Sequence, residues 1–352
     1  MHAALSSDGR AMLQSDLLTG LTWQGARIPY PGRFKGDTFP ITWADDDVLY
    51  SSAGDTVSEE KKDGLNIVAF HGDTDSYTID VLNPMLDFTG WGGAGLKPTG
   101  MLCRQGVLYL FAHNLGKSAD VELGHGYDAQ VFCSFDKGKT WQPDLKSVEK
   151  APMFPGRSFG SPAFINYGKD HQGATDRYVY ALSGVGWANG DYLVLGRVNG
   201  AQIMNRDAWR FVSGMDSDGA PIWSEDVSAA KPVLEDVGFL GCPEAIYVAS
   251  IKRYLVFSWH FKVRRPDKWS PDDGSELAVY ESPNPWGPFS VVAKLDWENE
   301  PVTPYNPRVP LKWFNPETLE GVLLFSGSWR DGGSSEYYRA HVRRFRLERP
   351  AG

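Results

Sequence analysis

The chain has 352 residues, of which 42 % are hydrophobic and 13 % are aromatic. This much apolar surface can build a substantial core, so a disordered chain is excluded. The 35 Lys and Arg residues against 44 Asp and Glu residues give a formal net charge of −9, which argues against a surface that neutralises the phosphates of nucleic acid. The longest apolar runs, such as residues 246–249 and 322–325, fall far short of the ~20 residues that a membrane-spanning helix needs. We therefore expect a folded protein with no nucleic-acid partner and no membrane span.

The amino-terminal segment and the cysteines give two further expectations. Residues 1–16 contain no basic region followed by an apolar stretch, so no signal peptide is visible. The three cysteines, Cys103, Cys133 and Cys242, each lie in an apolar, strand-like context. An odd number of widely spaced cysteines is a poor framework for disulfides. We expect three buried thiols, with a Cys103–Cys133 bridge as the alternative.

Short apolar runs rich in Val, Ile, Tyr, Phe and Trp recur along the chain, separated by Gly, Pro, Asp and Asn, which predicts an all-β fold. In chain order, five similar units follow one another, each with a first strand, a short turn and a more apolar second strand. The first strands begin within residues 36–40, 97–100, 158–162, 241–244 and 305–308, and the second strands cover residues 48–52, 107–112, 177–183, 253–258 and 321–326. A spacing of roughly 55–75 residues suits four-stranded blades with loops. The sequence therefore predicts a single domain over residues 1–352, a five-bladed β-propeller with residues 1–30 at its periphery.

Two segments between these strands have signals of their own. The run from Ser134 to Trp141 has the form S-x-D-x-G-x-T-W of the Asp-box hairpin of sialidase-like propellers. In that hairpin a short acidic side chain binds its own backbone, the glycine takes a positive φ and the tryptophan packs between blades, so we expect a structural role. Residues 205–213 predict a short inserted helix, which Asn205 can cap and Gly214 can end.

Polar side chains that begin first strands or follow second strands should gather around one mouth of the propeller. Three of them are carboxylates, Asp37, Asp55 and Glu244, and we take these as the candidate catalytic residues. The candidate substrate-binding residues are His113, Trp187, Trp259, His260, Tyr305, Arg308 and Trp329. Carboxylates that manage protons and aromatic faces that stack on sugar rings are what a carbohydrate site needs. Structural alternatives remain open: a turn contact for Asp37, satisfied buried imidazoles for the histidines, an inter-blade salt bridge for Arg308 and core packing for the tryptophans.

Other polar clusters indicate turns. The acidic triple at residues 45–47 lies in a tight connection between two strands, and residues 71–75 match no defensible metal-ligand spacing. The chain contains no phosphate-binding loop, no G-x-S-x-G elbow, no H-E-x-x-H motif and no paired cysteines. We therefore expect no cofactor and no metal ligands.

The residues of the first unit resemble a known family. The segment 36–47, which opens Gly36-Asp37-Thr38-Phe39-Pro40, followed by Gly54-Asp55, resembles the first blade of a five-bladed-propeller family associated with endo-D-arabinan hydrolases. Segments 205–211, 214–216, 221–224, 305–308, 312–313 and 323–327 are similar to the same family, so the resemblance covers most of residues 30–347. It implies hydrolysis of furanoside linkages in an arabinan such as that of mycobacterial cell-envelope glycans. Asp37 then matches the first-blade aspartate and Asp55 the acidic residue after the second strand. Likeness to other five-bladed arabinan hydrolases places Glu244 as a fourth-blade acid.

A glycoside hydrolase is the first of three functions that these residues allow. In it Asp37 acts as the base on water, and Glu244 or Asp55 supplies a proton to the leaving oxygen. A cell-wall glycan lies outside the cell, so this function implies a secreted or extracellular protein. We expect a monomer that acts on a polysaccharide substrate.

The two alternatives are a polysaccharide lyase and a non-catalytic glycan-binding propeller. In a lyase, His113 or His260 would remove the proton next to a uronate, Tyr305 would protonate the leaving oxygen and Arg308 would neutralise the substrate acid. An eliminated product absorbs in the ultraviolet, whereas a hydrolysed product does not. A binding module would need only the aromatic residues, and release of reducing ends would exclude it.

Overall fold

The computed structural model describes residues 12–58, 61–84, 95–115, 126–184, 186–263, 274–297, 302–329 and 335–350. Within these residues the secondary structure is almost entirely β, as the apolar alternation predicts, and its strands form successive groups that we number as blades 1 to 5. A short parallel pairing of the first strands of blades 3 and 4 joins these two blades into one sheet. Blade 1 contains β2 (Lys35–Asp37), β3 (Ile41–Trp43), β4 (Leu49–Ser58), β5 (Lys61–His71) and β6 (Thr78–Asn83), and blade 2 contains β7 (Lys97–Arg104), β8 (Val107–His113) and β9 (Gln130–Ser134).

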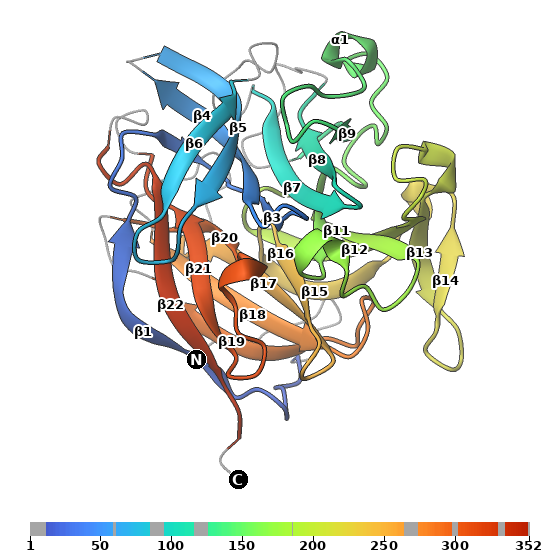
Figure 1. Ribbon diagram of the computed structural model, residues 1–352. Coiled ribbons are helices and arrows are strands. Elements are labelled where there is room, and N and C mark those ends of the chain that lie inside the picture. Colours follow the sequence, from blue (N-terminus) through green and yellow to red (C-terminus); the bar gives the residue numbers. More distant parts are fainter. Residues whose placement is uncertain are drawn as a thin grey trace.

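The remaining blades follow in the same order. Blade 3 contains β10 (Ser161–Asn166), β11 (Tyr178–Gly184), β12 (Gly190–Asn199), β13 (Arg210–Met215), β14 (Pro221–Ser224) and β15 (Pro232–Leu240). Blade 4 contains β16 (Glu244–Val248), β17 (Arg253–Phe261), β18 (Ser275–Ser282) and β19 (Ser290–Asp296). Blade 5 contains β20 (Tyr305–Arg308), β21 (Glu320–Ser326), β22 (Ala340–Glu348) and, from the other end of the chain, β1 (Gly20–Pro29). Figure 1 shows the blades succeeding one another around the molecule. The predicted first and second strands of all five units are confirmed.

The first and last parts of the chain share blade 5. Strand β1 pairs antiparallel with β22, from Gly20 opposite Glu348 to Pro29 opposite His341. The segment 1–30 that the sequence places at the periphery therefore includes the outer strand of a blade. Blade 5 also packs on blade 1 through a cluster of buried apolar side chains.

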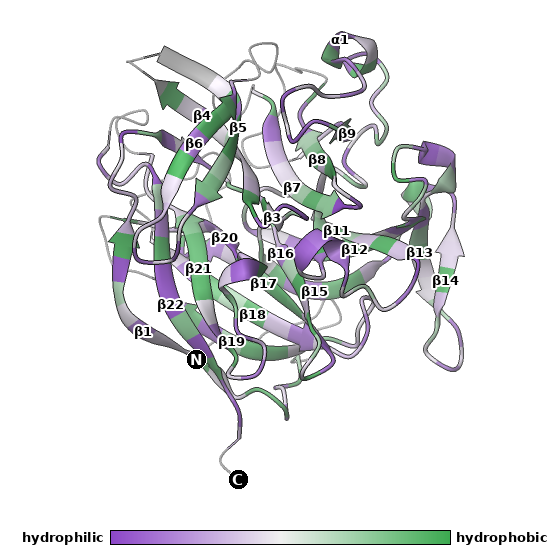
Figure 2. Ribbon diagram, viewed as in Figure 1, coloured by the Kyte–Doolittle hydropathy of each residue, from purple (hydrophilic) through white to green (hydrophobic). Residues whose placement is uncertain are grey.

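The hydrophobic core lies between blades, because each strand sends alternate side chains to opposite faces of its sheet. In β17, Leu255 and Phe257 face blade 5, whereas Tyr254 and Val256 face blade 3. Similar layers fill the interfaces of blades 2 and 3 and of blades 1 and 2. Figure 2 shows the result: β5 and β21 are largely hydrophobic, and the outlying β14 is mostly pale.

Helical structure in the described residues is limited to short turns: α1 (Leu145–Val148), η2 (Lys169–His171), η3 (Arg206–Ala208), η4 (Val227–Ala229) and η6 (Leu311–Trp313). None of these is long and apolar enough to cross a membrane. The inserted helix is present but shorter than expected. Asn205 caps η3 by accepting the Asp207 N–H at 3.1 Å, yet the chain is extended again from Arg210. The helix ends early because of tertiary contacts, since Phe211 is fully buried in β13 between strands β12 and β14.

The Asp-box hairpin forms as predicted. Asp136 accepts the Thr140 N–H at 2.8 Å, and Gly138 has a φ of 91°. The Trp141 indole donates to the Gly138 carbonyl at 3.0 Å and packs on the apolar layer between blades 1 and 2. The three cysteines are free and buried, as expected, so the alternative disulfide is wrong.

Candidate active site

Side chains from all five blades meet around the starts of the first strands. The three candidate carboxylates are buried there, with exposed fractions of 6 % for Asp37, 6 % for Asp55 and 3 % for Glu244. Asp37 ends β2, and it pairs with Gly54, the residue before Asp55. The other blades contribute Lys97 and His113 from blade 2, Ser161 from blade 3, Glu244 from blade 4, and Tyr305 and Arg308 from blade 5.

The backbone next to Asp37 is strained and held by blade 5. Thr38 has a φ of 67°, and Asp55 has a φ of 43°. A left-handed conformation costs an L-residue about 1–2 kcal/mol and is rare for a β-branched residue. The Thr38 N–H donates to Ser326 Oγ at 3.0 Å, and its carbonyl accepts from Arg308 Nε at 2.9 Å. Strain that neighbouring groups hold in place is typical of functional sites.

The surroundings of Asp37 favour its protonated form. Burial raises the pKa of its carboxyl to about 8, and the negative charge of Asp55 adds to this effect. Lys97 and hydrogen bonds from Tyr305 and Tyr338 oppose the shift without cancelling it. Tyr305 Oη donates to Asp37 Oδ2 at 3.0 Å.

Asp55 has the opposite environment. The ammonium of Lys97, the first residue of β7, lies 2.5 Å from Asp55 Oδ1, and both side chains are 9 % exposed. Such a close positive charge favours the ionised carboxylate. Tyr338 Oη fixes the same residue by donating to the Asp55 carbonyl at 3.0 Å. Two neighbouring carboxyls in unlike environments are the arrangement that separates a general acid from a general base.

Arg308 joins three blades. Its side chain is fully buried, and Nη1 donates to the Pro243 carbonyl at 2.9 Å and lies 3.5 Å from Glu244 Oε2. With the contact to Thr38, it connects blades 1, 4 and 5. The inter-blade role that the sequence left open for Arg308 is therefore the one its contacts show. Burial raises the pKa of Glu244 to about 7, against the opposing charge of Arg308.

The aromatic candidates form one cluster beside Tyr305. The Tyr305 and Trp329 rings are 5.0 Å apart at 90°, and the Trp187 and Trp259 rings are 5.0 Å apart at 83°. Trp259 and Tyr305 are fully buried, whereas Trp187 and Trp329 are half-buried. Trp259 therefore packs inside the cluster, and Trp187 and Trp329 are its tryptophans with ring surface available to a sugar.

The two histidines differ in position. His113 lies in the site: its Nδ1 is 3.0 Å from the Gly160 carbonyl and 2.9 Å from Ser161 Oγ, and burial lowers its pKa to about 3, so the ring is neutral. His260 points to the opposite face of β17 from Trp259, where it lies 2.9 Å from a Glu276 carboxylate oxygen and contacts the Phe239 ring. None of these contacts joins His260 to the candidate catalytic carboxylates Asp37, Asp55 and Glu244.

Buried polar atoms without a hydrogen-bond partner collect at this mouth, as far as the described part of the chain shows. They include Glu244 Oε1, His113 Nε2, Arg308 Nη2 and both amide atoms of Asn306. An unpaired buried polar atom costs about 1–3 kcal/mol, so a concentration of them points to a polar ligand.

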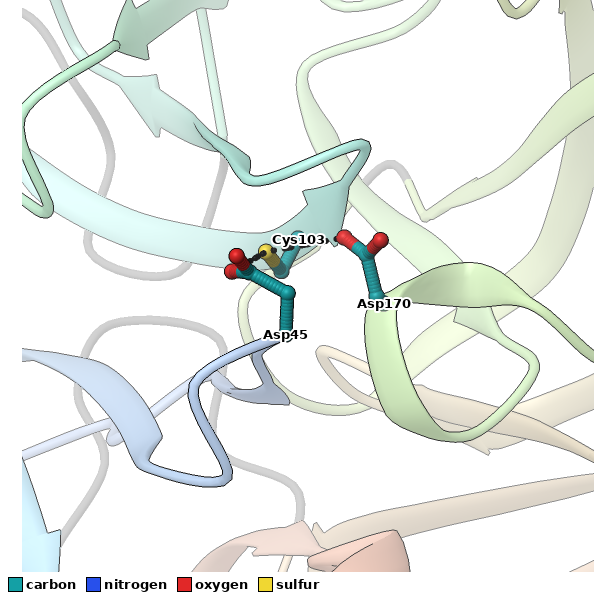
Figure 3. Close-up of side chains that lie close together, drawn as sticks. All are labelled: Asp45, Cys103 and Asp170. Atoms are coloured by element: carbon teal, nitrogen blue, oxygen red, sulfur yellow. Dashed lines mark hydrogen bonds between the residues drawn. The ribbon is translucent and has the colours of Figure 1, made fainter.

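A second cluster lies at the other end of the first strands (Figure 3), where ligand atoms of Asp45, Cys103 and Asp170 lie within 4.8 Å of one another. Burial raises the pKa of the Cys103 thiol to about 12, and its Sγ lies 3.3 Å from Asp170 Oδ1 as a hydrogen-bond donor. The Lys137 ammonium contacts Asp45 Oδ1. A protonated thiol and the ammonium of Lys137 beside Asp45 fit a structural network better than a metal centre. The acidic triple at residues 45–47 forms the strand connection that the sequence predicts.

Sequence reasoning missed Lys97 and Tyr338. Lys97 has a recognisable signal, because it opens the first strand of unit 2 as Glu244 opens that of unit 4, and a charge at the start of a buried strand requires a partner. Tyr338 precedes β22 in a turn, and its local sequence carries no comparable signal.

No family model and no curated protein matches the chain. Solved structures do match. The α-L-arabinofuranosidase from Podospora anserina in complex with cellotriose has a TM-score of 0.51 at 12 % identity, covering 94 % of this chain and 98 % of that one. The GH43_1 enzyme from Xanthomonas citri complexed with xylotriose has a TM-score of 0.52 at 15 % identity, covering 90 % and 88 %. The catalytic domain of the GH62 α-L-arabinofuranosidase from Coprinopsis cinerea has a TM-score of 0.51 at 12 % identity, covering 94 % and 98 %. The likeness shows the fold, the five-bladed β-propeller of these enzymes.

Proposed function

We propose that the protein is a glycoside hydrolase that cleaves furanoside linkages within an arabinan, an endo-acting D-arabinanase. One observation carries the proposal: two neighbouring buried carboxyls have opposite charge environments. Asp37 has a pKa raised to about 8, and Asp55 is ion-paired with Lys97 at 2.5 Å. Hydrolysis of a glycosidic bond needs one carboxylic acid and one carboxylate at the same linkage.

In the proposed mechanism, Asp37 donates its proton to the leaving glycosidic oxygen and Asp55 accepts a proton from the attacking water. This reverses the assignment drawn from the sequence, in which Asp37 is the base. The reason is that burial and the negative charge of Asp55 raise the pKa of Asp37, while the Lys97 ammonium lies against the Asp55 carboxylate. Glu244, whose pKa is raised to about 7, is the alternative acid.

Two likenesses support the furanoside substrate. The first-blade segment 36–55 resembles endo-D-arabinan hydrolases, and two of the similar solved structures are named as α-L-arabinofuranosidases. Trp187 and Trp329 supply half-buried rings beside the acidic pair for stacking on sugars. An arabinan of a cell envelope lies outside the cytoplasm, and we place the site of action there.

The test is release of reducing ends from a panel of polysaccharides that includes mycobacterial arabinogalactan, plant arabinan and xylan. We expect D-arabinofuranosyl oligosaccharides of mixed length early in the reaction, and Asp55→Asn should abolish them. Asp80→Asn is the matched control, because this aspartate is exposed on β6. Release of single sugars alone would contradict endo cleavage, ultraviolet-absorbing products would indicate a lyase, and binding without any release would indicate a non-catalytic propeller.

A further inference from the structure

A cavity of about 260 Å³ lies at the edge of blade 5, bordered by β1, β21, β22, η6 with the residues that follow it, and the turn between β5 and β6 of blade 1. The positions of residues along β21 show that this cavity lies apart from Asp37 and Asp55. Val322, on its wall, lies four residues along β21 from Ser326, which pairs with Tyr305 at the mouth. Four strand residues span about 13 Å. A ligand in this cavity would therefore bind away from the catalytic carboxyls.

The floor of the cavity is aromatic. The rings of Phe314 and Phe345 lie 6.2 Å apart at 31°, and the half-buried Trp313 stands beside them with its ring 5.8 Å from that of Tyr77. Gly321 makes this packing possible, because a Cβ there would lie 2.5 Å from Phe314 Cδ2. Phe345 is fully buried and Phe314 is 8 % exposed, so the half-buried Trp313 is the aromatic side chain here with surface for the apolar face of a sugar ring.

The indole N–H of Trp313 is buried and has no hydrogen-bond partner. The indoles of Trp259 and Trp297 lack a partner as well, whereas Trp141 donates to the Gly138 carbonyl and Trp209 to the Ile203 carbonyl, each at 3.0 Å. Of these three unpaired indoles in the described residues, Trp313 is the one that lines the cavity. An unpaired buried donor is unfavourable, and a hydroxyl oxygen of a ligand would supply the acceptor.

The charged groups around the cavity are already neutralised. Lys312 lies 2.8 Å from Asp47, Arg344 lies 2.6 Å from Asp75, and Glu320 is paired with an arginine of β22. The cavity therefore offers no net charge for an anion. The Thr74 hydroxyl accepts from Arg344 at 2.7 Å, and the Gln24 amide lies 3.4 Å from a Glu320 oxygen, so both have partners within the protein. Asn315 is exposed at the cavity and can donate through its amide nitrogen to a neutral polyhydroxylated ligand.

We propose that this cavity is a second carbohydrate-binding site, which holds one sugar ring of the polysaccharide without cleaving it. Its volume falls just below the ~300–1,000 Å³ of pockets for larger ligands, so one ring fits and an oligosaccharide does not. The choice of arabinan as the ligand rests on the proposed function. A second attachment point raises the effective concentration of polymer at the catalytic mouth.

The test uses the full-length Asp55→Asn protein, in which the substrate survives, titrated calorimetrically with short linear D-arabinofuranosyl oligosaccharides. We expect two ligands per chain and a shift of the Trp313 indole resonance in the NMR spectrum. Asn315→Asp keeps the oxygen that accepts the Glu317 N–H at 2.9 Å but removes the amide donors. It should weaken the second binding event about tenfold, the loss of one hydrogen bond. Asn199→Asp is the matched control, because Asn199 likewise accepts the N–H of Ala201 at 3.0 Å.

In the otherwise unaltered protein, Asn315→Asp should leave kcat on short oligosaccharides unchanged and raise the apparent KM on the polymer. One ligand per chain with an unmoved Trp313 resonance would overturn the proposal, even if arabinan is hydrolysed. Binding at Trp313 in a protein that hydrolyses no arabinan would overturn the proposed function and leave the second site standing.

Discussion

Replacement of Asp37 by asparagine tests the proposed proton donor. At pH 6 a carboxyl with the ordinary pKa of 3.8 is less than about 1 % protonated, whereas one with a pKa of about 8 is about 99 % protonated. The buried site thus makes almost every molecule competent to donate. Asparagine cannot donate an acidic proton, so turnover of arabinan should fall about 10²–10⁴-fold.

The decisive assay compares arabinan with an aryl arabinofuranoside whose leaving group needs no proton. Asp37→Asn should be strongly impaired on arabinan and much less on the aryl substrate, whereas Asp55→Asn should be impaired on both. Activity of the unaltered protein should fall as pH rises through about 8, where Asp37 ionises, and this alkaline limb should vanish in the variant. If Asp37→Asn loses both activities equally and Glu244→Gln is the variant that the aryl substrate rescues, then Glu244 is the acid and the reasoning from burial is wrong.

Stability provides an independent readout of the same group. Because the pKa of Asp37 is higher in the folded protein than its ordinary value, its contribution to stability is complete below about pH 4 and is lost as pH rises through about 8. Asp37→Asn has no proton to lose, so its unfolding midpoint should decline less over this range. Equal declines in the two proteins would show that the carboxyl is not protonated in the folded state.

Three further outcomes follow from other contacts. Lys97→Met should shift the acidic limb of the pH–rate profile to higher pH by about one unit or more, since Asp55 loses its positive neighbour. Lys97→Arg should restore the position of the limb, and an unmoved limb in Lys97→Met would remove Lys97 from the mechanism. Gly138→Ala should lower the free energy of unfolding by more than ~1–2 kcal/mol, because φ is 91° and its Cβ would lie 2.8 Å from Ile67 Cγ2. Gly156→Ala, at a φ of 74° in open space, is the control in urea denaturation, and equal losses would contradict the steric argument. The three buried thiols should resist labelling until the protein unfolds, and rapid native labelling would refute their burial.

Local patterning determined the elements of this protein. Alternation of apolar residues located the first and second strands of all five blades, because a strand buried on both faces needs only its own residue pattern to be recognised. The Asp-box was equally predictable, since Ser134, Asp136 and Thr140 bond to one another within a few residues. The repeat predicted that Asp37, Asp55 and Glu244 share one mouth, and Glu244 does open its strand. The structure differs in detail at the other two, since Asp37 ends β2 and Asp55 lies within β4 instead of after it.

Only the tertiary structure shows how the surroundings of these carboxyls differ. Asp55 is paired with Lys97, 42 residues away. The raised pKa of Asp37 comes from burial and the charge of Asp55, against the hydrogen bond from Tyr305, 268 residues away. The same is true of residues 210–213, where pairing with β12 and β14 overrides a helical signal. Protonation and strand pairing depend on distances between segments remote in sequence, and a linear pattern does not contain those distances.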